Sequence, residues 1–169
     1  AMHTPGPVYF RVTRYAVPEL FGPNHAFVWG RGETLREGAD VTLFGTGIMT
    51  WFCLDAADLL AREGIDAEVI HLASVKPIDR ALIAASVSKT GCAVTAENAS
   101  IYGGLGDAVA EVLAEDCPAP VQRIGVRDKF VESGGIDELF ARYQMTPADI
   151  TKAARLALST KAKREVLIG

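Results

Sequence analysis

The chain has 169 residues, of which 49% are hydrophobic and 22% are charged, and its formal net charge is -4. This length suits one domain with a core that can fold alone, and the composition is that of a folded globular protein. The charge gives no reason to expect a nucleic acid or a membrane surface as a partner. The three cysteines are widely spaced, no run reaches the roughly 18 apolar residues of a membrane span, and the first residues lack a signal-peptide pattern. We therefore expect a cytoplasmic protein without a disulfide framework or a metal cluster.

The first 38 residues differ from the rest of the chain. The stretch VYFRV (residues 8–12) predicts a strand. Pro18 and Pro23 then predict an irregular connection, because proline disfavours helix in the residue before it. The turn EGAD (Glu37–Asp40) ends this part. We expect residues 1–38 to be a strand and a linker, and residues 39–169 to form a regular domain.

From residue 39 onward, apolar runs alternate with helical patterns. Strands are predicted in DVTLFGTG, AEVIHLA, CAVTAEN and APVQRIGV. Helices are predicted in IMTWFCLDAADLLAREG, VKPIDRALIAASVSKTG and GGLGDAVAEVLAED, and near residues 136–143 and 147–159. The strands are nearly continuous apolar runs, as expected when helices cover both faces of a parallel sheet. The predicted fold is a three-layer α/β sandwich with a mainly parallel, mixed sheet of about five strands.

Trp51 occupies an unusual place in the first of these helices. Asp55, Asp58 and Arg62 mark the polar face of the helix, and one turn back the same face reaches Trp51. A large aromatic ring on this face indicates a contact with another subunit or domain, or shelter under a local loop.

Three glycines, Gly103, Gly104 and Gly106, open the helix that follows the third predicted strand of the domain. Ligands of open α/β sheets bind where strands end and helices begin, and helix N-termini attract phosphate. The spacing matches neither GxGxxG nor GxxxxGK[ST], however, and Asp107 already supplies an anion to the helix dipole. We expect a turn that permits close packing rather than a phosphate site.

Candidate catalytic groups are few. The three histidines lie far apart in the sequence, and His71, inside an apolar strand, is expected to be a hydrogen-bonded core residue. No nucleophile motif is present. Glu97, at a strand end, is the best single carboxylate, and we favour a structural role in which it accepts hydrogen bonds from loop amides over acid–base catalysis. The sequence predicts no catalytic residue, no metal ligands and no cofactor site in this chain alone.

Four segments occur in an order that resembles the C-terminal domain of the transketolase family of thiamine-diphosphate enzymes. They are GPVYFRVTRYAVP, EGADVTLFGTGIMTWFCLDAADLLAREGIDAEVIHLASVKPID, VTAENASIYGGLGDAVAEVLAE and VRDKFVESGGIDELFARYQMTPADITKAA. The best match is the separate C-terminal subunit of split bacterial transketolases. Deoxyxylulose-phosphate synthase and the β subunit of 2-oxo acid dehydrogenases share the same domain.

This resemblance implies that residues 1–38 are the exit strand and linker of a middle, pyrimidine-binding domain. Thiamine diphosphate and its divalent metal, Mg²⁺ or Ca²⁺, would then be held by other domains of a parent that moves a two-carbon ketol unit between sugar phosphates. The chain alone would be inactive and would serve assembly, as a homodimer and with the remaining transketolase domains or an N-terminal subunit. Two rival readings are a free-standing docking module and a small-anion binder that uses the helix N-termini near Gly47 and Gly104.

The resemblance also assigns residues. Thr13-Arg14 matches a Ser/Thr-Arg pair that contacts the sugar-phosphate substrate, and the guanidinium of Arg14 can bind a phosphate through two hydrogen bonds. Tyr15 and Ala99 depart from the glutamine and the histidine that many relatives carry there. An interface with the rest of the enzyme is expected along the edge that carries Trp51, Glu97, Gly103, Gly104 and Gly106.

Overall fold

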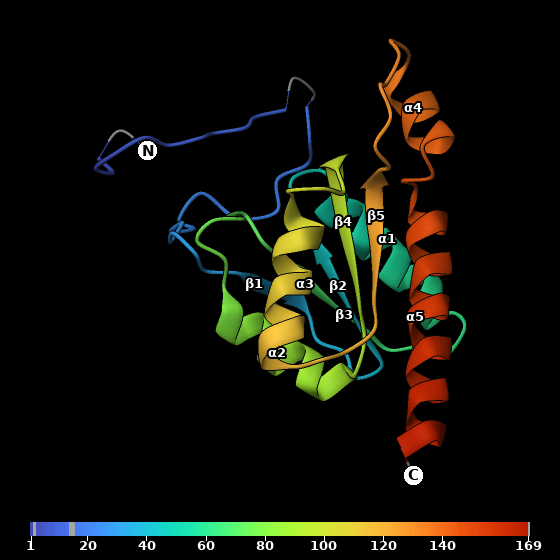
Figure 1. The fold of residues 1–169 in the computed structure, drawn as a ribbon. Coiled ribbons are helices and arrows are strands. Elements are labelled where there is room, and N and C mark those ends of the chain that lie inside the picture. Colours follow the sequence, from blue (N-terminus) through green and yellow to red (C-terminus); the bar gives the residue numbers. More distant parts are fainter. Residues whose placement is uncertain (2, 14–15, 169) are drawn as a thin grey trace.

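The computed structural model describes residues 1, 3–13 and 16–168, which form one mixed five-stranded sheet between two layers of helices (Figure 1). The strand order is β1-β3-β2-β4-β5; β1 runs antiparallel to β3 and the other neighbours are parallel. The predicted α/β class with a mainly parallel sheet is confirmed. The strands are β1 (Glu33–Arg36), β2 (Val41–Gly45), β3 (Ala67–His71), β4 (Ala93–Ser100) and β5 (Val121–Val126). The helices are α1 (Met49–Ala61), α2 (Arg80–Thr90), α3 (Leu105–Asp116), α4 (Ile136–Arg142) and α5 (Pro147–Ile168).

Both faces of the sheet are buried, which explains why the strands are apolar throughout. Alternate residues of a strand point to opposite faces. Leu43 accordingly packs in a core with α1, α4 and α5, and its neighbour Phe44 packs in a second core with α2 and α3. The rings of Phe52 and Phe140, 4.9 Å apart and nearly perpendicular, join α1 to α4. No helix in the described part of the chain is both long and apolar enough to cross a membrane.

Two elements differ from the sequence-based prediction near the N-terminus. The strand predicted in VYFRV is wrong: residues 8–12 have no regular structure, and Tyr9 and Phe10 are exposed. A strand needs a neighbour for its backbone groups, and no strand of the described residues pairs with this segment. Conversely, Glu33–Arg36 forms the edge strand β1, although it has no apolar run to reveal it. Because β1 precedes residue 38, the domain boundary predicted there stays a prediction.

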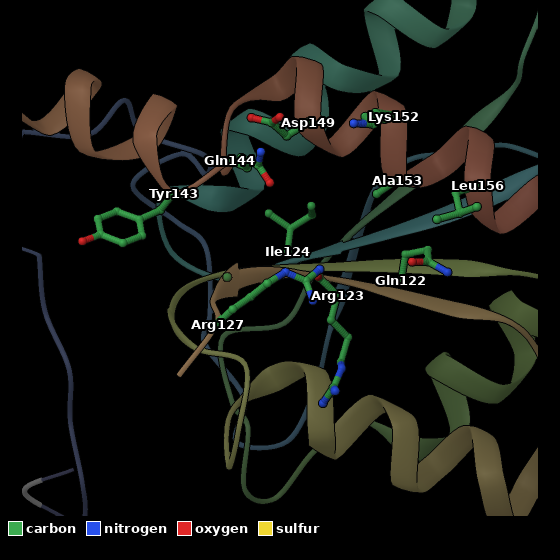
Figure 2. Close-up of a pocket in the computed structure, with 11 residues that line it drawn as sticks. Gln122, Arg123, Ile124, Arg127, Tyr143, Gln144, Asp149, Lys152, Ala153 and Leu156 are labelled. Atoms are coloured by element: carbon green, nitrogen blue, oxygen red, sulfur yellow. The ribbon is translucent and has the colours of Figure 1, made fainter. Parts of the chain in front are cut away.

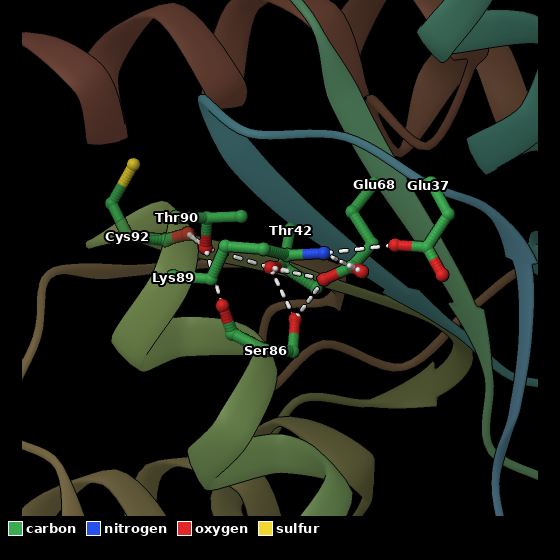
Figure 3. Close-up of polar contacts among 7 residues, drawn as sticks. All are labelled: Glu37, Thr42, Glu68, Ser86, Lys89, Thr90 and Cys92. Atoms are coloured by element: carbon green, nitrogen blue, oxygen red, sulfur yellow. Dashed lines mark hydrogen bonds and ion pairs between the residues drawn. The ribbon is translucent and has the colours of Figure 1, made fainter.

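A buried polar network fastens α2 to the amino-terminal ends of the strands (Figure 3). Glu68 of β3 is only 3% exposed, and its carboxylate accepts hydrogen bonds from Ser86 and, at 2.6 Å, from Nζ of Lys89. The Thr42 hydroxyl lies 2.6 Å from Oγ of Ser86 and 2.8 Å from Oγ1 of Thr90. Hydrogen bonds to Glu68 and then Glu37 raise the pKa of Lys89. The lysine therefore stays charged and compensates the buried carboxylate.

Candidate functional site

The carboxyl ends of the parallel strands form the edge where a ligand would be expected, and Glu97 lies there in β4, directly after Ala96, the last residue of β4 that pairs with β2. Its side chain is almost fully buried, and its two oxygens accept hydrogen bonds from the first turn of α3, Oε2 from Leu105 N at 2.9 Å and Oε1 from Gly106 N at 2.8 Å. The predicted hydrogen bonds from loop amides to Glu97 are confirmed. This carboxylate satisfies helix N–H groups that have no partner within the helix.

Burial dominates the titration of Glu97. Loss of solvent raises the pKa of its carboxyl, and the hydrogen bonds from the Gly106 and Leu105 amides offset only part of that effect. A raised pKa is also a property of catalytic acids. Both oxygens of Glu97 are engaged by backbone amides, however, so the carboxyl is occupied in holding the turn.

The glycine turn is shaped around this carboxylate. A β-carbon on Gly104 would collide with Oε2 of Glu97, so no larger residue fits there while the carboxylate stays in place. A β-carbon on Gly106 would lie 2.8 Å from Cδ of Arg123 and 3.2 Å from Oγ1 of Thr95. Gly103 has a φ of +72°, a conformation that L side chains disfavour. The turn is therefore built for close packing.

A second carboxylate occupies the other free amide of the turn. Asp107 accepts a hydrogen bond from Gly103 N at 2.7 Å and forms an ion pair with Arg123. The N-terminus of α3 thus already has two carboxylates from its own chain, and a phosphate would have to displace one of them. At the N-terminus of α1, the amides of Met49, Thr50 and Trp51 donate to nearby backbone carbonyls. At both helix N-termini, acceptors of the chain itself therefore occupy amides that an anion would otherwise bind.

Trp51 is sheltered by the linker. Its ring is partly buried, and Nε1 donates a hydrogen bond to the carbonyl oxygen of Pro18 at 3.0 Å. Of the two expectations stated for this ring, the structure shows the local loop. A contact of Trp51 with another subunit stays a prediction.

His71 forms a hydrogen-bonded pair in the same region. Its Nδ1 lies 2.8 Å from Oγ1 of Thr50, and burial lowers the pKa of the imidazole. The ring of Phe21, from the linker, lies between His71 and His25, with ring centroids 5.6 and 3.9 Å away. The sequence did not predict this cluster, because its two histidines are 46 positions apart. The signal that the sequence offers is Phe21 and His25 within a Pro-rich connection.

Arg14, the predicted phosphate-binding residue, lies outside the described residues. The nearby Arg11 shows where this segment meets the domain. Its Nη2 donates to the carbonyl oxygen of Asn98 at 2.8 Å, and its Nη1 lies 3.4 Å from Oδ1 of the same residue. The exit segment therefore reaches the residue that follows Glu97, on the carboxyl edge of the sheet.

A shallow hollow lies elsewhere, between β5 and α5 (Figure 2). It is a groove of about 180 Å³ lined by polar residues such as Gln122, Gln144 and Lys152. Arg127 donates to the carbonyl oxygen of Arg123 at 3.2 Å, whereas the Arg123 side chain points away from the groove toward α3. The guanidinium of Arg127 thus covers a backbone acceptor of this outer strand, a common protection of sheet edges. Within the described residues, no group of three or more potential ligand side chains could hold a metal ion.

Comparison with known proteins identifies the domain. Residues 30–150 match the family model described as transketolase, C-terminal domain. The chain belongs to this family. It is 48% identical over 149 residues to the 6-deoxy-6-sulfo-D-fructose transketolase subunit of Clostridium sp. (strain MSTE9). The aligned region covers 88% of this chain and 46% of the relative. It is 37% identical over 169 residues to 1-deoxy-D-xylulose-5-phosphate synthase of Trichormus variabilis (strain ATCC 29413 / PCC 7937), covering 98% of this chain and 27% of that enzyme.

The fold agrees with this assignment to the transketolase C-terminal domains. A solved structure described as a split gene transketolase, inactive β4 tetramer, superimposes with a TM-score of 0.85 at 49% identity, covering 88% of this chain and 48% of that one. The resemblance stated from the sequence is confirmed. The chain spans about half the length of these transketolase relatives or less.

Proposed function

We propose that this chain is the C-terminal subunit or domain of a transketolase-type enzyme and that it serves assembly rather than chemistry. The parent would move a two-carbon ketol unit from a ketose phosphate to an aldose phosphate. The observation that carries the proposal is the Glu97 turn. The carboxyl edge, where an α/β domain would bind a ligand, is filled by the chain's own Glu97 and Asp107.

The cofactor and the metal belong to other parts of the proposed enzyme. Thiamine diphosphate would supply the carbanion chemistry of ketol transfer, together with Mg²⁺ or Ca²⁺. Among the described residues, no cluster suits the metal. This chain would contribute a rigid domain, a linker and the segment that carries Arg14, and it would associate as a homodimer and with the N-terminal part of the enzyme in the cytoplasm.

Reconstitution tests this proposal. The chain is assayed for ketol transfer with thiamine diphosphate and Mg²⁺, alone and mixed with the N-terminal, cofactor-binding subunit of a split transketolase from the same organism. We expect activity only in the mixture. Ketol transfer by the chain alone, or a mixture that neither associates nor reacts, would contradict the proposal.

Arg14 is proposed to bind the phosphate of the sugar substrate. In the reconstituted enzyme, Arg14→Ala should raise KM for phosphorylated sugars by about tenfold or more, because a charge-assisted hydrogen bond contributes roughly 1.5–3 kcal/mol. The effect should shrink for unphosphorylated sugars, and the exposed Lys152→Ala serves as a control for lost positive charge. Equal losses on both classes of sugar would make Arg14 structural.

The match to 1-deoxy-D-xylulose-5-phosphate synthase over 98% of the chain favours one alternative, that the parent is a synthase of that kind. If the reconstituted enzyme forms 1-deoxy-D-xylulose 5-phosphate and does not transfer ketol units between sugar phosphates, the parent is a synthase rather than a transketolase.

A further inference from the structure

Residues 18–25 of the linker, here called the strap, lie against the carboxyl edge of the sheet and contact α1, β3 and β1. Pro18 accepts the indole hydrogen bond of Trp51 from the first turn of α1, at 3.0 Å. Phe21 stacks on His25 within the strap, with centroids 3.9 Å apart and planes 12° apart. The same ring meets His71 at the end of β3, at 5.6 Å and 57°. The strap is thus attached by one hydrogen bond and one aromatic cluster.

Two titratable groups lie in this cluster with a single carboxylate between them. His71 pairs with Glu33 across β1 and β3, and Nε2 of His25 lies 3.8 Å from Oε1 of Glu33. From α1, the neighbour of His71 is the Thr50 hydroxyl at 2.8 Å. Glu33 is 43% exposed at its side chain and can compensate about one positive charge. Two protonated histidines would therefore leave one charge without a partner.

We propose that the strap is a pH-dependent latch, docked on the domain while His71 is neutral and released when His71 is protonated. The imidazole of His71 is half-buried beside an apolar ring, so its charged form loses solvation in the docked state and regains it when the strap leaves. A second charge on His25 adds repulsion. Stacking of a charged His25 on Phe21 would be attractive, but this attraction is smaller than the solvation that charged His71 loses. The lost solvation of His71 therefore determines that acid releases the strap.

The direction of the pH response follows from linkage. Burial is the largest cause and lowers the pKa of His71; Glu33 raises that pKa to a smaller extent, His25 lowers it less still, and the net shift is downward. The strap adds the ring of Phe21 to this burial, so docking lowers the pKa of His71 further. A base whose pKa docking lowers favours the docked state most at pH values above its ordinary pKa of about 6.5. This contribution falls as the pH drops below that value toward the lowered pKa. Acidification therefore releases the strap, and the linker between residues 1–17 and the domain becomes longer and freer.

Quenching of Trp51 fluorescence by acrylamide tests the latch, because the docked strap covers this ring. The full chain carries two tryptophans, so Trp29→Phe leaves Trp51 as the sole reporter. In this background we expect the quenching constant to rise several-fold between about pH 7.5 and about pH 5.5, which brackets the ordinary histidine pKa. Far-UV circular dichroism should stay constant. A quenching constant that is the same at both pH values would overturn the proposal.

Two variants test whether the histidines cause the rise in Trp51 quenching at acid pH. His71→Gln keeps a side chain that can bond Thr50 but cannot gain a charge, so its quenching should stay low at both pH values. Retention of the full response in His71→Gln would overturn the proposal. If this variant is already open near neutral pH, His25→Gln decides: loss of the neighbouring charge removes repulsion that opposes docking, so the midpoint of release should move to lower pH, and an unchanged midpoint would also overturn the latch. The assay needs no enzymatic activity, so its outcome is independent of the proposed function.

Discussion

Removal of the Glu97 carboxylate is the most direct test of the glycine turn. In Glu97→Ala, the amides of Leu105 and Gly106 lose the acceptors that lie 2.9 and 2.8 Å away, in a site that water does not reach. A hydrogen bond to a charged group contributes about 1.5–3 kcal/mol, so two contribute roughly 3–6 kcal/mol. Burial of the Glu97 charge offsets part of this, so we expect the lower end, a decrease of roughly 3 kcal/mol in the free energy of unfolding. For a domain of this size, that corresponds to a decrease in Tm of about 6–12 °C.

Glu97→Gln separates the hydrogen bonds from the volume of the side chain. The glutamine fills the same space and keeps one acceptor, but its amino group faces an N–H donor, so we expect about half of the loss seen in alanine. Protonation is different, because both oxygens of a carboxylic acid stay in place. Since burial raises the pKa of Glu97, the folded state binds this proton more tightly than the unfolded state does. The contribution of Glu97 to stability therefore increases as the pH falls through the raised pKa and decreases as the pH rises.

Urea unfolding and amide hydrogen exchange at neutral pH measure both variants. The exposed Glu111→Gln on the same helix removes a similar charge and should change the free energy of unfolding by less than about 0.5 kcal/mol. Protection should fall selectively at Leu105 and Gly106. If Glu97→Ala loses no more stability than the Glu111 control, Glu97 does not hold the turn.

Three further predictions follow from other contacts. Gly104→Ala should cost about 2 kcal/mol or more by forcing Glu97 off the α3 amides, whereas Gly22→Ala, with open space around it, should be neutral in the same urea titration; equal stabilities would show that the turn adapts. Lys89→Met should cost about 2–3 kcal/mol because the buried Glu68 loses its counter-charge, and the exposed Lys152→Met should not; a stability equal to wild type would contradict the role of Lys89. Burial raises the pKa of the Cys53 thiol, so a thiol reagent at neutral pH should label Cys117 in the native protein and Cys53 only after unfolding; prompt labelling of native Cys53 would refute its burial.

The sequence was sufficient for elements whose signals are local. The apolar run of β2 and the glycine at the end of α2 place those elements to within a few residues, and Gly91 adopts the left-handed conformation expected of a helix stop. The sequence predicts the end of α5 near Ser159, but no glycine or proline stops the chain before residue 169, and the helix continues to Ile168. These errors concern boundaries, which local patterns determine poorly.

The contacts of the site depend on the tertiary fold. That Glu97 would accept amides was predictable from its place before a glycine turn, but the fit of Gly104 against its carboxylate was not. β1 escaped prediction because an edge strand exposes much of its surface and has no continuous apolar run. The contact of the strap with the domain was not predictable, because Pro18 and Trp51 are 33 positions apart and no periodicity connects them. Contacts between an irregular segment and a helix have no repeating pattern in the sequence.

The arrangement of carboxylates fits the proposed assembly role of a domain that has the architecture of a ligand-binding fold. Open helix N-termini at the carboxyl edge of a parallel sheet attract anions. In this chain Glu97 and Asp107 neutralise the α3 terminus, and backbone carbonyls occupy the first amides of α1. The edge is thereby free to receive the protein's own segments, with Arg11 on Asn98 and Pro18 on Trp51. An edge satisfied by its own side chains can present a fixed surface to the rest of the enzyme without competing for the sugar phosphates that the parent is proposed to bind.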